Sequence, residues 1–316
     1  MDADVGTVSA RASLKERLAF LSPTYPWEAG ETLIRVLLFL AAVEAILVTL
    51  AIALTLLGET IGFFEIVSPW DFYTGTRWSP DIAGAFGVLP LVVGTLVIAG
   101  GACLTGIPLG LGAAIFLREY APARVREVVK PFLELLAGIP TVVFGFFGLL
   151  LISPALQDWF GADFFNGLTA ILVIGIMIVP IVSSLSEDAL TAVPSNLRDG
   201  ALALGATRFE AMSRVVVPGA FSGVVASCLL AFSRAVGETM IVLIVAGQNV
   251  HVEFNPLNQM DTMAAFLARR ATGDVSAADP ALFGSLFAVG FTLFLMTFAL
   301  NVVADRLRAR FREVYE

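Results

Sequence analysis

Six long apolar runs, neither alternating nor helix-periodic, limit what this chain can fold into. A run of about 18 or more such residues can cross a bilayer as a helix with lipid on all sides. The chain is 58% hydrophobic, only 15% charged and has a mean hydropathy of +0.87, values that a water-soluble domain does not reach. We predict an all-α, polytopic membrane protein with six transmembrane helices, at about 33–57, 87–117, 131–152, 168–186, 219–246 and 282–303. The second and fifth runs exceed one bilayer thickness, so they are expected to tilt, break or project.

Basic residues give the orientation, because cytoplasmic loops carry the excess of Lys and Arg. All but Arg35, Arg77, Arg234, Arg269 and Arg270 fall in the N-terminal tail, the loops after the second and fourth runs, or the C-terminal tail. Both termini are therefore expected in the cytoplasm. The predicted division is a cytoplasmic tail, a first membrane helix, an extracytoplasmic loop, a transmembrane domain and a cytoplasmic tail, at 1–32, 33–57, 58–86, 87–304 and 305–316.

The segments outside the runs suggest three smaller features. Ser13–Leu21 suits a short amphipathic helix at the inner surface, and a frayed polar tail is the alternative. The first run has no small-residue cleavage pattern after it, so it is expected to remain as a span. The aromatic-rich loop 58–86 suits interfacial anchoring or the docking of an external protein, and a helix is predicted around Asp261–Arg270.

Composition argues against several other functions. Cys103 and Cys228 lie in separate apolar runs without a nearby histidine, so neither a zinc site nor a disulfide framework is indicated. The single histidine, His251, lies in a loop, which argues against histidine acid–base chemistry as the basis of function. A net charge of −8 without a basic face argues against a nucleic-acid partner.

The polar segment 195–218 is too long to be a simple connector between the fourth and fifth runs. Ser195 is a predicted helix N-cap, and Thr207 with Glu210 matches a capping box, so two short helices are expected to meet at Gly205. Leu197, Ala201 and Leu204 would share one face of the first helix. Such a face either packs back on its own bundle or enters a groove of a partner.

This segment resembles the EAA loop of ABC importer permeases, which docks on the ATPase. The resemblance is carried by an acid, two small residues, a glycine and a final apolar-x-apolar-proline, at Asp199, Gly200, Ala201, Gly205, Val215, Val217 and Pro218. It departs from the usual pattern by Asp for Glu at 199, Gly for Ala at 200, and Val for Ile and Leu at 215 and 217. Gly200 weakens a helix by up to ~1 kcal/mol relative to Ala.

Arg234 and Glu238 lie four residues apart inside the fifth apolar run, on one helical face. A charge at bilayer depth costs at least ~3 kcal/mol, so both side chains are expected to face the bundle interior or a wet cavity. Two interpretations remain at this point. The pair either pins one helix to its neighbours, or Arg234 offers a forked donor to an oxyanion while Glu238 holds the guanidinium.

Several segments also resemble the PstC-type permease of the phosphate ABC importer, from about residue 70 to 304. They are RWSPDIAGAFGVLPLVVGTL, PLGLGAAIFLREYAP, PFLELLAGIPTVVFGFFG and SRAVGETMIVLIVAG. The resemblance implies the ABC type-1 importer permease fold, a PstA-type second permease, two PstB-type ATPases and a PstS-type phosphate-binding protein. It places the family's essential arginine and glutamate at Arg234 and Glu238. ATP and Mg²⁺ would bind the partner ATPase, since this chain has no GxxxxGK[ST] loop and no cofactor of its own is expected.

Alternatives remain at the level of substrate and class. Thr141, after Gly138 and Pro140, would offer a hydroxyl to the ion at a helix break, or the break would be a packing kink. Sulfate or molybdate would suit one arginine as well as phosphate does. An ion-coupled secondary carrier predicts paired repeats with interrupted helices, and we see no clear repeat. A membrane-embedded enzyme is disfavoured because the runs hold no nucleophile or metal constellation.

Overall fold

A computed structural model describes residues 29–80, 84–273 and 280–310 of the chain. The predicted amphipathic helix at Ser13–Leu21 lies outside these residues. Contacts divide the chain into two compact units, Met1–Gly58 and Glu59–Glu316. The first contributes most of one long apolar helix, and the second contains every other element described below.

The described residues are almost entirely helical, as predicted, with one short hairpin. In chain order the elements are α2 (Ala29–Phe64), α3 (Pro69–Thr74), β1 (Trp78–Ser79), β2 (Ala85–Phe86), α5 (Leu89–Ile115), η3 (Phe116–Tyr120), α6 (Ala123–Ala137), α7 (Thr141–Phe147), η4 (Gly148–Ile152), α8 (Ser153–Phe160), α9 (Gly167–Ala192), α10 (Ser195–Ala203), α11 (Arg208–Ala211), η5 (Met212–Val216), α12 (Val217–Gly219), α13 (Phe221–Val236), α14 (Met240–Val245), α15 (Met263–Thr272) and α16 (Pro280–Arg310). The segments labelled η are π-helical turns.

Five helices are long and apolar enough to cross a membrane, and a bent helix pair raises the number to six. Four of the five match predicted runs: Glu31–Phe64, Leu89–Tyr120, Gly167–Ala192 and Pro280–Leu307. The third predicted span, 131–152, is displaced. Residues 131–137 belong to α6, and after a break at 138–140 the membrane-length helix covers Thr141–Phe160. Pro140 explains the break, because the residue before a proline disfavours helical backbone.

The fifth predicted span, 219–246, is not one helix. It bends by 73° at Ala220, where the segment before α13 meets α13, and it is interrupted again between Val236 and Met240. The length of this run predicts that it tilts, breaks or projects, and in the structure it is broken. The second interruption contains Glu238.

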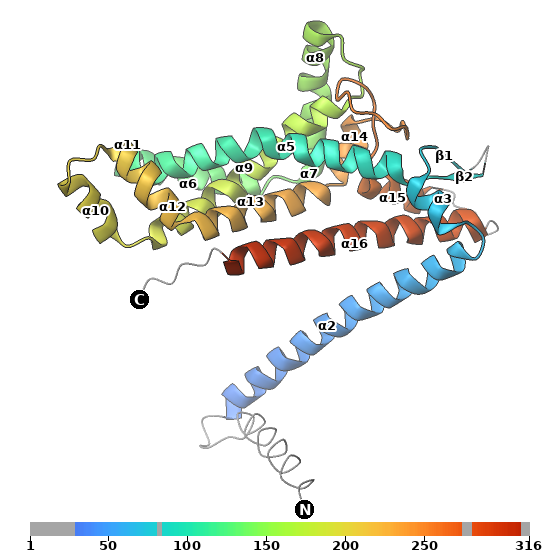
Figure 1. The fold of residues 1–316 in the computed structure, drawn as a ribbon, viewed down its shortest axis with the longest axis horizontal. Coiled ribbons are helices and arrows are strands. Elements are labelled where there is room, and N and C mark those ends of the chain that lie inside the picture. Colours follow the sequence, from blue (N-terminus) through green and yellow to red (C-terminus); the bar gives the residue numbers. More distant parts are fainter. Residues whose placement is uncertain (1–28, 81–83, 274–279, 311–316) are drawn as a thin grey trace, which may run out of the picture. The chain divides into compact units, whose positions relative to one another are not determined.

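The core of the second unit is the pair α5 and α9, against which α13 packs (Figure 1). Glycines of α5 allow the close approach. A Cβ at Gly106 would lie 2.5 Å from the carbonyl oxygen of Gly175 on α9, and one at Gly110 would lie 2.6 Å from Cβ of Val182. Without an aqueous driving force between helices in lipid, such small-residue contacts are a main source of helix association.

Three aromatic residues of the predicted loop 58–86 are buried, which differs from the expectation of membrane-surface anchors. Phe63, Phe72 and Trp78 are 1%, 0% and 8% exposed and pack with Phe266 of α15. Trp70, at 75% exposure, is a true surface aromatic. The helix α15 confirms the prediction around Asp261–Arg270. It is fixed on α5 by Thr95, whose Oγ1 accepts a hydrogen bond of 3.0 Å from the Met263 N–H.

Within the second unit, the segment 195–218 and the outer loops lie at opposite ends of α5 (Figure 1). The hairpin β1–β2 and α15 adjoin the N-terminal end of α5, whereas η3 continues its C-terminal end toward α10. This separation means that any signal between the two ends must travel along helices such as α5 and α9.

Candidate functional site

Arg234 and Glu238 meet at the break in the fifth span. Nη1 of Arg234, in the last turn of α13, donates a 2.6 Å hydrogen bond to Oε2 of Glu238. The other carboxylate oxygen, Oε1, accepts from the backbone N–H groups of Met240 and Ile241 at 3.2 Å each. Glu238 therefore joins the end of α13 to the start of α14. The two side chains form an ion pair, but they do not lie on one helix as predicted, because α13 ends at Val236.

The two partners of this ion pair differ sharply in exposure. The Glu238 side chain is 2% exposed, and that of Arg234 is 40% exposed. The carboxylate has both oxygens occupied by protein donors, whereas a guanidinium has five N–H groups, of which the pair uses one. The Arg234 guanidinium is therefore fixed on one side by a buried carboxylate, and part of the guanidinium remains accessible.

A separate break, at 138–140, precedes α7, which packs on α14. A Cβ at Gly145 of α7 would be 2.8 Å from Cδ1 of Ile244, and one at Gly148, the first residue of η4, would be 3.4 Å from Cγ1 of Val245. Thr141 is the first residue of α7. It is half-buried, and no contact of its hydroxyl with Arg234 or Glu238 is among the described interactions.

The segment 195–218, called the docking loop below, has the predicted two-helix form. Gly205, with φ of +92°, separates α10 from α11, and the Thr207–Glu210 capping box is complete. The Thr207 backbone N–H and hydroxyl donate to the Glu210 carboxylate and hold its pKa below the ordinary value. The predicted N-cap at Ser195 is wrong by one residue, because Pro194 occupies the cap and Ser195 makes no capping hydrogen bond.

The apolar face of the docking loop is left open. Leu204 is 92% exposed, Leu197 42% and Phe209, just beyond Gly205, 70%. Of the EAA-like positions, Asp199, Gly200 and Pro218 are exposed as well, and Ala201 is half-buried. Of the two interpretations of this face, packing back on the bundle therefore does not apply in the structure. Large apolar side chains exposed together on a polar loop mark a surface for a partner.

Two ion pairs that were not predicted join helices far apart in the sequence. Arg198 of α10 contacts Glu119 of η3, and Lys130 of α6 contacts Glu187 of α9 at 3.1 Å. The second pair borders a cavity of about 370 Å³ between α6 and α9. Their partners are far apart in the sequence, so helical spacing gave no signal. The available signal was a basic residue in a predicted cytoplasmic loop together with an acidic residue near the end of a predicted span.

Solved structures share this architecture. One permease chain of a bacterial alginate ABC transporter superposes with a TM-score of 0.63 at 15% identity, covering 91% of this chain and 99% of that one. A chain of the MetNI methionine ABC transporter gives 0.57 at 17% identity, covering 72% and 96%. At such identities the likeness shows the fold. The fold class is the ABC type-1 importer permease.

Sequence comparison identifies the family. Residues 106–313 match the family described as "Binding-protein-dependent transport system inner membrane component". The phosphate transport system permease protein PstC of Xylella fastidiosa is 34% identical over 295 residues, covering 87% of this chain and 89% of its own. The probable ABC transporter permease protein YqgH of Bacillus subtilis is 33% identical over 250 residues, covering 77% and 79%. The chain belongs to the binding-protein-dependent inner membrane transport family, among the PstC-type permeases.

Membership confirms that the chain is a transport subunit and not an enzyme, since the relatives are named as transport permeases. It also decides against the secondary-carrier alternative, because the matched relatives and structures belong to ABC transporters. Within the described residues, no group of three or more His, Cys, Asp or Glu side chains could hold a metal ion.

Proposed function

We propose that this chain forms half of the translocation pathway of an ATP-driven importer of inorganic phosphate, with Arg234 as the residue that meets the ion. The observation that carries the proposal is the half-exposed guanidinium held at a helix break by a buried carboxylate. A permanently charged, forked donor can give two parallel hydrogen bonds to two oxygens of an oxyanion. The similarity to PstC permeases favours phosphate among the oxyanions.

Glu238 has a positioning role in this proposal. Because both of its oxygens are engaged by Arg234, Met240 and Ile241, it has no free edge for the ion in this conformation. It would set the direction of the guanidinium and reduce the net positive charge, so that the ion is bound weakly enough to leave. A carboxylate that accepts a hydrogen bond from protonated phosphate would distinguish it from sulfate. Such a contact would require Glu238 to turn from its present partners.

The broken helices support a pathway at this point. Non-helical backbone at membrane depth is tolerated where it lines a cavity or is buried in protein. The breaks at 138–140 and 237–239 precede α7 and α14, which pack on each other, and Thr141 follows the first break. The proposal keeps Thr141 as a secondary contributor to the pathway.

The docking loop is proposed to couple transport to an ATPase. Its open apolar face, with Leu204 and Phe209, would enter a groove of a PstB-type ATPase, and Asp199, Gly200, Ala201, Gly205 and Pro218 would set its shape. ATP and Mg²⁺ would bind there and not on this chain. A PstA-type permease would supply the other half of the pathway, and a PstS-type protein would deliver phosphate. The chain would span the cell inner membrane with both termini in the cytoplasm.

The test is uptake by the complete complex. The chain with its second permease, ATPase and binding protein is reconstituted in vesicles, and ATP-dependent uptake of labelled phosphate, sulfate and molybdate is measured. Arg234→Gln is expected to lower phosphate uptake by at least about a hundredfold, because a charge-assisted donor is replaced by a neutral amide. Arg124→Gln, at an exposed arginine of α6, is the matched control and should transport normally.

Assembly must be measured in the same preparations, by co-purification of the ATPase. Normal transport by assembled Arg234→Gln would mean that the ion pair only pins the helices. If the wild type takes up sulfate or molybdate and not phosphate, the importer function stands and the proposed substrate is wrong.

A further inference from the structure

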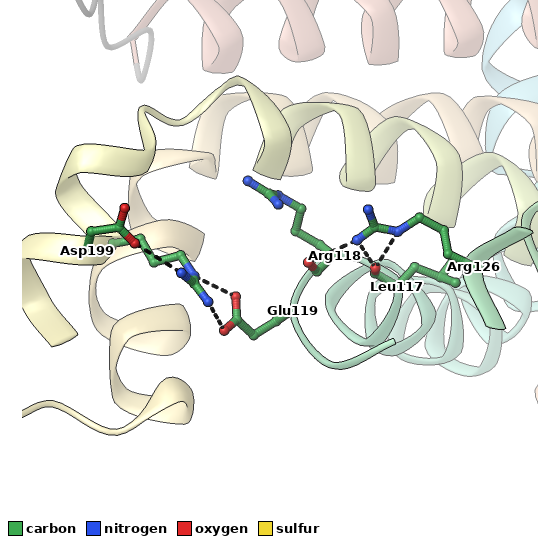
Figure 2. A network of polar contacts seen from close by, with 6 residues as sticks. Leu117, Arg118, Glu119, Arg126 and Asp199 are labelled. Atoms are coloured by element: carbon green, nitrogen blue, oxygen red, sulfur yellow. Dashed lines mark hydrogen bonds and ion pairs between the residues drawn. The ribbon is translucent and has the colours of Figure 1, made fainter. Parts of the chain in front are cut away.

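The docking loop is tied to the second span by one bidentate ion pair. Nε of Arg198 donates to Oε2 of Glu119 at 2.8 Å, and Nη2 donates to Oε1 at 2.6 Å. Nη1 donates to Asp199 at 3.1 Å, so the arginine is also held against its own helix. Figure 2 shows Glu119, at the end of η3, pointing toward the helix that carries Asp199.

This pair is a direct side-chain connection between α10 and the continuation of the second span. α10 has no buried residue, and within the docking loop it packs on α11 and η5. The Glu119 side chain is 3% exposed and that of Arg198 is 29% exposed. The hydrogen bonds that Arg198 donates to Glu119 raise the pKa of Arg198 above its ordinary value, despite the opposing effect of burial. Partial burial and two parallel hydrogen bonds make this contact more rigid than a surface ion pair.

The Glu119 side of the pair is rigidly joined to α5. η3 follows α5 without a break, and Leu117 within it is 1% exposed. Arg126 of α6 braces the turn by donating to the carbonyl oxygen of Leu117, and to that of Arg118 at 3.1 Å (Figure 2). Glu119 therefore cannot shift far without α5, whose glycines are packed directly on α9.

We propose that the Arg198–Glu119 pair is the strut through which movement of the docking loop displaces α5 and so reaches the transport pathway. The inference rests on the proposed function, because it needs an ATPase that moves α10. Arg198 and Glu119 are positioning residues, and neither contacts the ion. A force on α10 reaches the end of α5 directly through this pair. The other described route runs through η5, whose Met212 and Val216 pack in an apolar cluster with Ala114 of α5.

The experiment separates coupling from assembly. In the reconstituted complex, ATP hydrolysis and uptake are measured together, and co-purification reports ATPase docking. The double variant Arg198→Gln/Glu119→Gln removes both charges, so no buried carboxylate is left alone. It is expected to assemble and hydrolyse ATP, with uptake per ATP lowered at least about tenfold because the bidentate contact is lost. Arg198→Lys should be intermediate, since an ammonium cannot reproduce the fork.

A second experiment replaces the ion pair with a covalent bridge. In a background with Cys103→Ala and Cys228→Ala, the variant Arg198→Cys/Glu119→Cys should be uncoupled, and a short bifunctional maleimide should restore uptake per ATP. A merely structural pair would change assembly or thermal stability while assembled complexes kept the wild-type ratio, and that result would overturn the strut. Absence of recovery on bridging would overturn it too. Failure of the wild-type complex to import phosphate would instead reject the proposed substrate, and the ratio would then be measured with the oxyanion that it carries.

Discussion

At the scale of single residues, charge and backbone conformation are concentrated at a few positions. Arg234 and Glu238 show the division clearly: one side chain is accessible and the other is enclosed by protein donors. Gly205 is the corresponding position in the backbone. Its φ of +92° lies in a region that other residues enter only with strain. Each of these positions allows a substitution with a close internal control.

Gly205→Ala is expected to weaken ATPase docking, whereas Gly200→Ala is not. Holding alanine in the left-handed region costs roughly 1–2 kcal/mol, so the variant should relax the turn and reorient α10. Gly200 lies within helix α10 with nothing within 4 Å of an added Cβ, and alanine there should strengthen the helix by up to ~1 kcal/mol. Co-purification of the ATPase at increasing detergent concentration measures both. Equal retention in the two variants would show that the turn at Gly205 does not set the docking geometry.

At the scale of elements, apolar length predicted most spans, and local chemistry decided where helices stop. The third span differs from its predicted range because Pro140 divides α6 from α7. The sequence predicts a break at Gly138 and Pro140, but the predicted range did not use it. The capping box at Thr207 and the turn at Gly205 were predictable because their partners are within a few residues. The Arg198–Glu119 pair was not predictable, because its partners are far apart in the sequence and meet only where the docking loop packs at the end of α5.

The α5–α9 contact provides a prediction for these elements. Gly106→Ala is expected to destabilise the complex by about 1–3 kcal/mol, because its Cβ would lie 2.5 Å from the backbone oxygen of Gly175 and 2.5 Å from Cγ1 of Ile178. Gly100→Ala on the same helix is the control, since nothing lies within 4 Å of its added Cβ. Thermal unfolding of the purified complex in detergent should separate the two variants by several degrees. Unfolding temperatures that coincide would argue against close packing at Gly106.

At the scale of the whole molecule, the loops sort into two chemical types. The docking loop, η3 and α6 carry most of the described basic side chains, whereas the aromatic cluster with Phe72 and Trp78 lies at the opposite end of α5. Within the outer group, Asp261 is paired with Arg269, and burial raises the pKa of this carboxyl against the influence of the arginine. The asymmetry of basic residues predicts that the docking-loop end faces the cytoplasm.

Labelling of single cysteines tests this orientation. In the background with Cys103→Ala and Cys228→Ala, one cysteine is introduced at Ala203, exposed at the end of α10, and another, separately, at Phe254, which is 70% exposed in the outer loop. A membrane-impermeant maleimide should label Phe254→Cys in intact spheroplasts and Ala203→Cys only after permeabilisation, because basic loops remain on the inner side. The reverse pattern would place the docking loop outside, where no ATP-driven partner could reach it. The proposed coupling would then fail together with the orientation, whatever ion Arg234 meets.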